Sequence, residues 1–397
     1  MKKNLQSNIW KYTLLLISNK RVFVAILGAY YLTVPGVTPQ WIGTILLAGT
    51  LAGFLLEIPS GYVSDKIGHK KALVISRAMM LASTILFLAG EKIIFLVLAS
   101  IFMSASNAFH SGTGSAFMHE TLRALNKEKD YSKIMGKISS IGFAVPIIFM
   151  VLVPFLVSVN YKIPFIISLF VDLIGLFAAI SLVRPPVLQE HIEEINATNF
   201  RQVVREGYNL KFFRFSIFVG IIAGVLFGIS AFRAPYQLFI GIPVIWFGVF
   251  FGIGRALASL MLAYSGKIKE LTKDVYSFYK FRLVFYAVMI FILGTISVPW
   301  IVVFVFIISN AFQWGLSQVG AGYMLEIIRT SKFKATLLSV SSQIEEIFAA
   351  ISVFGLGFAI ERSSYSSGFL YLGIAFIAVL LPLYLYIINC RDRRPSP

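Results

Sequence analysis

The sequence predicts an all-α integral membrane protein with twelve transmembrane helices in two pseudo-symmetric six-helix bundles. Of its 397 residues, 58% are apolar and 13% are charged, whereas soluble domains have about 45–50% apolar residues and roughly a quarter charged. The mean hydropathy is +0.82. A chain that crosses lipid must satisfy its backbone groups in helices or in a closed barrel. Long unbroken apolar runs, in place of short alternating segments, indicate helices.

Twelve apolar segments follow one another along the chain, and most reach the length of about 20 residues that a bilayer core requires. The first is short: either residues 10–17 complete it, or they form a separate helix at the membrane surface. The segments are 21–35, 40–63, 72–89, 93–122, 133–157, 164–183, 214–237, 244–264, 276–297, 300–327, 335–360 and 368–389.

The lysines and arginines gather on one set of loops. Of the 35, 30 lie in alternate stretches between and beside the segments, which overlap the segment ends: 1–21, 66–77, 123–137, 184–214, 267–282, 329–334 and 391–394. The opposite loops hold Lys92, Lys162 and Arg362, with Arg233 near that side, and Arg255 lies inside a segment. The positive-inside rule places the basic loops in the cytoplasm. We therefore expect a protein of the cytoplasmic membrane with both termini in the cytoplasm.

The composition also excludes several classes of protein. The net charge of +17 reflects topology, because the aromatic residues that could stack on bases lie in apolar runs, and we expect no nucleic-acid partner. One cysteine excludes a disulfide framework and a multi-cysteine metal site. No phosphate-cradling Gly-x-x-x-x-Gly-Lys-Ser/Thr motif occurs. We expect no cofactor, no bound metal and no catalytic residues.

The loop at 184–213 is the clearest boundary in the chain. Pro185 and Pro186 end the preceding helix, and residues 199–211 are typical of a short amphipathic helix at the cytoplasmic surface. The sequence thus predicts an N-terminal bundle at 1–183, a cytoplasmic linker at 184–213, and a C-terminal bundle with a short tail at 214–397.

The two halves repeat one another at a nearly fixed offset. Trp41-Ile42-Gly43 recurs as Trp246-Phe247-Gly248, and Phe117-Met118-His119-Glu120 recurs in similar form as Tyr323-Met324-Leu325-Glu326. Because six is an even number, both copies cross the membrane in the same sense. Parallel repeats of this kind place a substrate site near the bilayer midplane, between the halves.

A short charged loop separates the second and third segments. It reads Gly61-Tyr62-Val63-Ser64-Asp65-Lys66-Ile67-Gly68-His69-Lys70-Lys71 and follows Glu57-Ile58-Pro59-Ser60. Gly61 and Gly68 permit close backbone approach or a positive φ, and Asp65 can pair with cations or accept hydrogen bonds from a helix N-terminus. The simplest interpretation is a charged cytoplasmic turn whose lysines anchor the topology.

This loop resembles the signature of the major facilitator superfamily: Gly, three residues, Asp, a basic residue, any residue, Gly and a basic cluster. His69 stands where an arginine is usual. The preceding Glu-Ile-Pro-Ser-Gly run is similar to a subgroup with Glu-Ile-Pro-Thr-Gly. The arginine that drug/proton antiporters carry early in segment four has no counterpart. The resemblance implies a transporter whose halves are latched on the cytoplasmic side by Gly61, Asp65, Lys66, Gly68, Lys70 and Lys71, with Glu120 as partner of the lysines.

Six ionisable residues inside the apolar segments form the candidate site for substrate binding or proton coupling: Glu57, His110, Asp172, Arg255, Glu345 and Glu346. A charge at a helix centre costs about 2.5–3.5 kcal/mol, so such residues tend to have a role. A histidine or a carboxylate can change protonation as the cavity opens to one side of the membrane and then to the other. An arginine can hold an anion or neutralise a carboxylate. The alternative is that each residue only pairs or packs between helices, Glu57 beside the 61–71 loop.

Polar and aromatic residues could complete a cavity suited to an amphiphilic solute: Tyr31, Phe232, Tyr236, Asn310, Gln313 and Trp314. Together these features predict a monomeric secondary active transporter that exports a small solute by alternating access in exchange for protons. Its partners are the solute, protons and the lipid bilayer. The nearest alternative is a facilitator or importer of a nutrient, and a membrane-embedded lipid enzyme or a channel is more distant.

Overall fold

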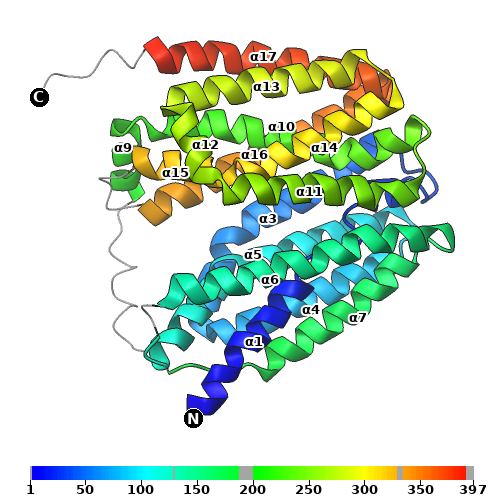
Figure 1. The fold of residues 1–397 in the computed structure, drawn as a ribbon. Coiled ribbons are helices and arrows are strands. Elements are labelled where there is room, and N and C mark those ends of the chain that lie inside the picture. Colours follow the sequence, from blue (N-terminus) through cyan, green and yellow to red (C-terminus); the bar gives the residue numbers. More distant parts are fainter. Residues whose placement is uncertain (1, 128–129, 187–199, 329–333, 390–397) are drawn as a thin grey trace, which may run out of the picture. The chain divides into compact units, whose positions relative to one another are not determined.

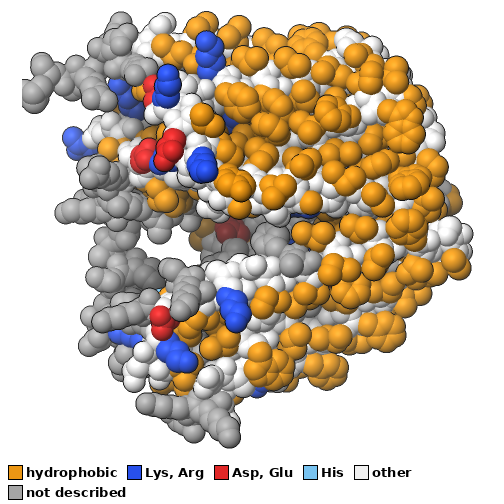
Figure 2. All heavy atoms as spheres, in the orientation of Figure 1, with side chains coloured by type: hydrophobic (Ala, Val, Ile, Leu, Met, Phe, Trp, Pro, Cys, Tyr) orange, Lys and Arg blue, Asp and Glu red, His pale blue; other side chains and the backbone are white. Residues whose placement is uncertain are grey.

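The computed structural model describes residues 2–127, 130–186, 200–328 and 334–389 (Figure 1). Every regular element in these ranges is a helix. Eleven helical segments among them are long and apolar enough to cross a membrane. Hydrophobic side chains cover the long sides of the helices, whereas charged side chains gather near one end (Figure 2). The prediction of an all-α membrane fold is therefore confirmed.

Backbone contacts divide the chain into two compact units. Unit 1 consists of Met1–Val37, Ala48–Ile192 and Val244–Gly252, and unit 2 consists of Thr38–Leu47, Glu193–Pro243 and Ile253–Pro397. Two helices are therefore divided between the units: the beginning of each belongs to one unit and the rest of it belongs to the other. The predicted bundle boundaries, 1–183 and 214–397, stay a prediction.

Unit 1 is organised around pairs of adjacent helices. Its helices are α1 (Lys2–Ser18), α2 (Leu27–Tyr31), most of α3 (Pro39–Ile67), α4 (His69–Leu88), α5 (Ile93–Ala124), α6 (Tyr131–Leu152), the 3₁₀ helix η2 (Val153–Ser158) and α7 (Ile163–Ser181). The 3₁₀ helix η4 (Val244–Trp246) and the start of α11 (Phe247–Ala263) also belong to unit 1. α1 packs on α6 and α7, and α4 packs on α5 and α7 (Figure 1).

The first predicted segment, 21–35, is not one continuous helix. α1 ends at Ser18 and α2 begins only at Leu27, with turns between them. Tyr12 and Leu15 of α1 are buried in the core of unit 1 beside Leu73 and Phe117. Residues 10–17 are therefore part of a packed helix, because their apolar side chains find partners inside the unit.

Unit 2 pairs its helices in the same manner. α10 packs on α16, and α13 packs on α17 (Figure 1). The linker helix expected at 199–211 is present as α9, whereas linker residues 187–199 lie outside the described ranges. The helices are α9 (Phe200–Asn209), α10 (Phe212–Phe239), most of α11, α12 (Ser265–Thr272), α13 (Val275–Thr295), α14 (Pro299–Gly315), α15 (Ser317–Ile327), α16 (Lys334–Arg362) and α17 (Tyr365–Asn389).

The repeated Trp-x-Gly motif marks two close helix contacts. A Cβ at Gly43 would lie 2.9 Å from the carbonyl oxygen of Val353 on α16, within unit 2. A Cβ at Gly248 would clash with the carbonyl oxygen of Met150 on α6, within unit 1. Small residues let membrane helices approach closely. The repeat in sequence thus corresponds to a repeated packing role.

Gly43→Ala is expected to destabilise the protein by about 1–3 kcal/mol, because the added methyl group overpacks against backbone atoms that cannot move aside. Thermal unfolding of the purified protein in detergent measures the change. Gly355→Ala is the matched control, because a Cβ at Gly355 on α16 meets no heavy atom within 4 Å. Equal unfolding temperatures for the two variants would contradict the assigned contact.

Candidate functional site

The predicted 61–71 loop is a sharp corner between two helices. α3 continues to Ile67 and α4 begins at His69, so the loop is much shorter than expected. Gly61 lies within α3, with no heavy atom within 4 Å of a Cβ built on it. Gly68 turns the chain with a φ of +90°, a conformation that favours glycine.

His69 joins three helices at this corner. Its Nε2 lies 3.3 Å from Glu120 Oε1 on α5, and its Nδ1 lies 3.0 Å from Ser64 Oγ on α3. Thr113 on α5 donates to Ser64 Oγ at 2.9 Å. Glu120 therefore pairs with the histidine that replaces the family's arginine, where the sequence pointed to the lysines.

The remaining charged residues of the motif lie at the same corner. Asp65, Lys66 and Lys71 are exposed, and Lys70 is half-buried. The negative charge of Asp65 interacts electrostatically with the imidazole of His69. The corner thus combines one bonded cluster with a solvent-accessible group of cations.

Unit 2 contains a corresponding ion pair. Lys269 on α12 pairs with Glu326 on α15, and the hydroxyls of Thr272 and Tyr323 lie 2.8 Å apart. Glu326 is the repeat counterpart of Glu120, and Lys269 lies in the repeat counterpart of the 61–71 motif. Each unit therefore ties a helix corner to the end of another helix by one contact between a basic and an acidic side chain.

Asp172 lies at the centre of a buried network in unit 1. Arg21 Nη2 and Nη1 donate to its Oδ1 and Oδ2 at 2.6 and 2.8 Å, and Thr84 Oγ1 donates to Oδ2 at 2.5 Å. The side chains of Asp172 and Arg21 are 1% and 8% exposed. A bidentate pair with both oxygens engaged is strong and directional. These contacts favour the structural alternative for Asp172.

A second arginine lies in the same core. Arg77 is 1% exposed, and its Nη2 donates to Asn19 Oδ1 at 2.6 Å and to Ser76 Oγ at 3.1 Å. Its Nε and Nη1 make no hydrogen bond within the ranges that the structure describes. The charge of Asp172 also acts on Arg77. Asp172 is thus the ion-pair partner of Arg21 and acts on Arg77 only through its charge.

Glu57 differs from Asp172 in exposure and in its partner. It is exposed on α3, and Ser111 Oγ on α5 donates to Glu57 Oε1 at 2.9 Å. Asn107, Ser111 and Ser115 are also exposed, and their spacing of four residues aligns them on one face of α5. Glu57 therefore joins a polar stripe on α5 and does not contact the 61–71 corner through this bond.

His110 is a packed residue of unit 1. Its ring stacks on Tyr12, with 6.4 Å between ring centroids and 12° between the planes. Its buried Nδ1 has no hydrogen-bond partner among the described residues. The stacking favours the packing alternative for this histidine.

The adjacent carboxylates of α16 occupy different environments. Glu345 is half-buried and Glu346 is exposed, as expected for neighbours that point about 100° apart on a helix. The charges that act on Glu345 are those of Arg282 on α13 and of Glu346 itself. The half-buried Arg282 therefore provides a favourable charge for Glu345.

Arg255 lies against an aromatic ring in unit 2. Its guanidinium carbon is 4.1 Å from the centre of the Trp314 ring on α14. Trp314 is 40% exposed, Gln313 is half-buried, and Asn310, one turn earlier, is 8% exposed. The structure thus brings Arg255 together with Trp314, and Asn310 lies beside Gly254, the residue before Arg255.

The other three predicted lining residues are core residues. Tyr31, Phe232 and Tyr236 are 1%, 0% and 0% exposed. Tyr236 stacks on Tyr365 with ring centroids 5.2 Å apart, and its hydroxyl donates to the carbonyl oxygen of Leu293 at 3.1 Å. Aromatic side chains bury large areas and dominate such cores. These three residues pack the helices and do not line an open surface here.

Several functional-site candidates are not apparent from the sequence alone. Arg21, Arg77 and Arg282 count as loop cations there, whereas the structure places them inside helical units, and it buries Arg233 within α10. One signal was available: apolar residues flank Arg77 and Arg233 on both sides. Partner residues such as Thr84 carry no such signal, because hydroxyls are common in membrane helices.

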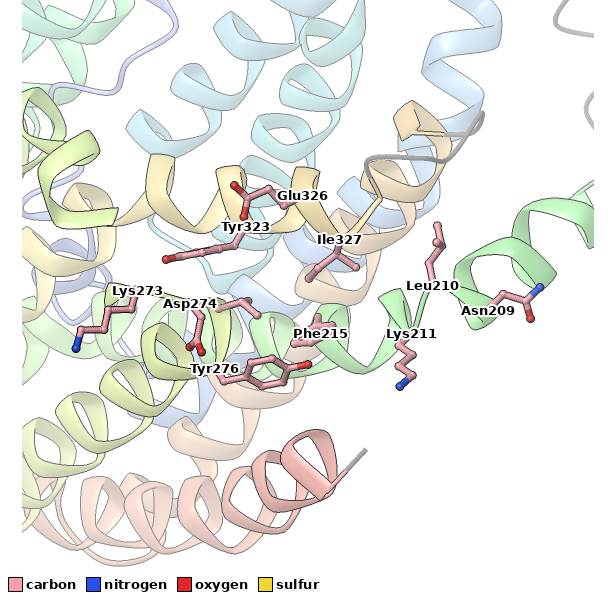
Figure 3. Close-up of a pocket in the computed structure, with 11 residues that line it drawn as sticks. Asn209, Leu210, Lys211, Phe215, Lys273, Asp274, Tyr276, Tyr323, Glu326 and Ile327 are labelled. Atoms are coloured by element: carbon pink, nitrogen blue, oxygen red, sulfur yellow. The ribbon is translucent and has the colours of Figure 1, made fainter. Parts of the chain in front are cut away.

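A cavity of about 500 Å³ opens in unit 2 where α10 and α13 begin and α15 ends (Figure 3). Phe215 and Tyr276 lie on one side of it, and Tyr323 and Glu326 on the other. Its size lies within the usual range for small-molecule sites. None of the six predicted intramembrane ionisable residues lines it. Separately, the described residues contain no group of three or more His, Cys, Asp or Glu that could hold a metal ion.

Membrane-length helices, a repeated half and ion pairs at equivalent corners define a polytopic helical membrane protein built by duplication. A sequence model of the Major Facilitator Superfamily matches residues 12–344. The chain therefore belongs to this superfamily and is a membrane transporter, not an enzyme. The narrower subgroup with Glu-Ile-Pro-Thr-Gly stays a prediction.

Solved structures of transporters have the same fold at low sequence identity. A mutant of the nucleoside transporter NupG matches with a TM-score of 0.76 at 13% identity, covering 97% of this chain and 99% of its own. A bacterial homologue of the human lysosomal transporter Spinster matches with a TM-score of 0.73 at 15% identity, covering 100% and 98%. A POT family transporter matches with a TM-score of 0.69 at 13% identity, covering 98% and 96%. No curated protein matches the chain by direct sequence comparison.

Asp172→Asn is expected to destabilise the protein by about 3–5 kcal/mol, because it leaves Arg21 buried without its counter-charge. Thermal unfolding in detergent measures the loss. Glu91→Gln is the control: Glu91 is 81% exposed and lies 3.8 Å from Lys162, so its removal costs about 0–1 kcal/mol. An Asp172→Asn variant as stable as Glu91→Gln would show that the pair does not hold unit 1 together.

Proposed function

We propose that this transporter exports a small amphiphilic solute in exchange for protons. The observation that carries the proposal is the exposed carboxylate of Glu57, held by the hydroxyl of Ser111 at 2.9 Å. Glu57 lies in the part of α3 that belongs to unit 1, within a helix of membrane-spanning length. A carboxylate kept in such a helix is costly and is a functional candidate by default.

The partner of Glu57 suits proton exchange. A serine hydroxyl can donate to the ionised carboxylate and can accept from the protonated one. Glu57 can therefore gain or lose a proton without leaving this serine contact. By contrast, protonating Asp172 would leave the buried Arg21 without a counter-charge. Of these two carboxylates of unit 1, we therefore assign the proton-exchange step to Glu57.

The surroundings of Glu57 support an amphiphilic solute. Leu55, Ile58 and Tyr62 on α3 are 66%, 70% and 69% exposed, and they follow helical spacing along one side. The polar stripe of α5 lies on the other side of Glu57, through Ser111. Adjacent apolar and polar stripes match a solute that has one apolar part and one polar part.

Direction and topology belong to the same proposal. Protons that enter the cell down their gradient would drive the solute outward. Cytoplasmic termini in the cytoplasmic membrane are supported by the basic loops, even with Arg21, Arg77 and Arg282 inside helical units. We take the monomer as the working state.

We further propose that the corner pairs keep each unit rigid while the transporter alternates. His69–Glu120 in unit 1 and Lys269–Glu326 in unit 2 each tie a helix corner to a neighbouring helix. Alternating access in this superfamily requires halves that move largely as rigid bodies. If one corner contact were lost, the helices of that unit could shift against one another, and the unit would move less as a rigid body.

Glu57→Gln is expected to abolish proton-driven accumulation and to preserve solute exchange, because the amide keeps an acceptor for Ser111 but cannot release a proton. The assay uses proteoliposomes with an acidic lumen and three probes: 2-naphthoate, 2-naphthylmethylammonium and 2-naphthylmethanol. The unaltered protein should accumulate at least one probe beyond the level in protein-free liposomes, where an amine collects in the acidic lumen by itself. Nigericin, which removes the pH gradient, should stop this protein-dependent accumulation.

Glu91→Gln is the control for this assay, since it removes an exposed carboxylate elsewhere in unit 1. It should transport like the unaltered protein. Accumulation that ignores nigericin would indicate a facilitator. Retention of gradient-driven transport by Glu57→Gln would remove Glu57 from the coupling step.

His69→Ala is expected to slow transport several-fold, because it removes the cation and the hydroxyl contact that tie α4 to α3 and α5. His69→Arg should retain most of the rate, because arginine can still pair with Glu120. Initial rates in the same proteoliposomes give the comparison. If Ala and Arg behave alike at position 69, the pair with Glu120 has no part in the cycle.

A further inference from the structure

Unit 2 contains a cluster of hydrogen-bond donors beside an aromatic ring that the proton-exchange step does not use. Arg255 on α11 lies over the ring of Trp314 on α14 at 4.1 Å. Both residues lie in segments of membrane-spanning length. Arg233 on α10 is 6% exposed, and its charge interacts with that of Arg255. Arg233 and Arg255 thus bring two positive charges together in unit 2.

Arg255 presents its donors beside the Trp314 ring. The N–H bonds of an arginine lie in the guanidinium plane and form a fork that matches the two oxygens of a carboxylate. The contact at 4.1 Å keeps this fork close to Trp314, which is 40% exposed and on whose ring a second aromatic group can stack.

Asn310 adds a donor at the same place, by an independent observation. It is 8% exposed, and its Nδ2 finds no acceptor in the described part of the chain. This nitrogen lies 3.1 Å from the position of a Cβ at Gly254, the residue before Arg255. A buried amide donor without an acceptor is unfavourable, and an anion bound at Arg255 would satisfy it.

We propose that Arg255, Asn310 and Trp314 form the binding site for the acidic head of the solute, and that the solute is an aromatic carboxylate. The carboxylate accepts from Arg255 and from Asn310 Nδ2, and the aromatic part of the solute packs on Trp314. This inference rests on the proposed function, because it names the class of the transported solute. An inside-negative membrane potential favours the exit of such an anion.

The test measures binding without any gradient, on the purified full-length protein, by thermal shift and isothermal titration calorimetry. The probes are 2-naphthoate, 2-naphthylmethylammonium and 2-naphthylmethanol, which share a ring system and differ in charge. We expect 2-naphthoate to bind at least about tenfold more tightly than the other two. Arg255→Gln, Trp314→Leu and Asn310→Ala should each weaken it.

The matched control is Arg362→Gln. Arg362 lies over the Phe358 ring at 4.9 Å at the end of α16, so it has the same stack without the neighbouring amide. It should leave 2-naphthoate binding unchanged. If Arg255→Gln fails to fold, Arg255→Lys carries the test, because lysine keeps the charge but lacks the fork and should bind several-fold more weakly.

Three results would overturn the inference: equal or tighter binding of the cation or the alcohol, no binding of any probe, or unaltered 2-naphthoate affinity in folded Arg255→Lys and Asn310→Ala. These results are separable from failure of the proposed function. If 2-naphthoate binds selectively but a pH gradient does not drive its transport, the anion site is supported and proton exchange is contradicted. If a pH gradient drives the transport of only the other two probes, proton exchange is supported and the anion site is contradicted.

Discussion

Lipid offers no partner to a charge, so a charged side chain between these helices pairs inside the protein or faces water. The pair of Arg21 with Asp172 shows this constraint most directly: both side chains are almost fully buried, and two hydrogen bonds of 2.6 and 2.8 Å join them. Such a pair gains little over apolar packing, yet removing one member leaves an uncompensated charge. It therefore fixes which helices of unit 1 lie together, and the rest of the unit packs around it.

The same constraint separates carboxylates by what their partners allow. Asp172 accepts from one arginine on both oxygens and from a hydroxyl on one of them, so its charge is needed for the fold. Glu57 is exposed and accepts from the neutral hydroxyl of Ser111, so its charge is dispensable to packing. In unit 2, the Arg255–Trp314 stack and the buried amide of Asn310 supply donors. The proposed proton-exchange carboxylate thus lies in unit 1 and the proposed anion-binding donors lie in unit 2.

Duplication explains why features of the two units correspond without being identical. Gly43 and Gly248 both make room for a neighbouring backbone, and Glu120 and Glu326 both accept an ion pair at a helix corner. Their partners have diverged, to a histidine in one unit and a lysine in the other. Packing requires the same shape in both copies, whereas a corner pair requires only opposite charge.

The sequence by itself determined the all-helical membrane architecture, the repeat and the superfamily, because hydropathy, helix length and the Gly61–Lys71 motif are local properties of the chain. It also identified Arg255 and Glu57 as charges that needed an explanation. Only the tertiary structure decided their partners: Ser111 follows Glu57 by 54 residues, and Asp172 follows Arg21 by 151. The tertiary structure also shows that Tyr31, Phe232 and Tyr236 are core residues. The sequence could not show this, because apolar segments look alike whether they face a cavity, lipid or another helix.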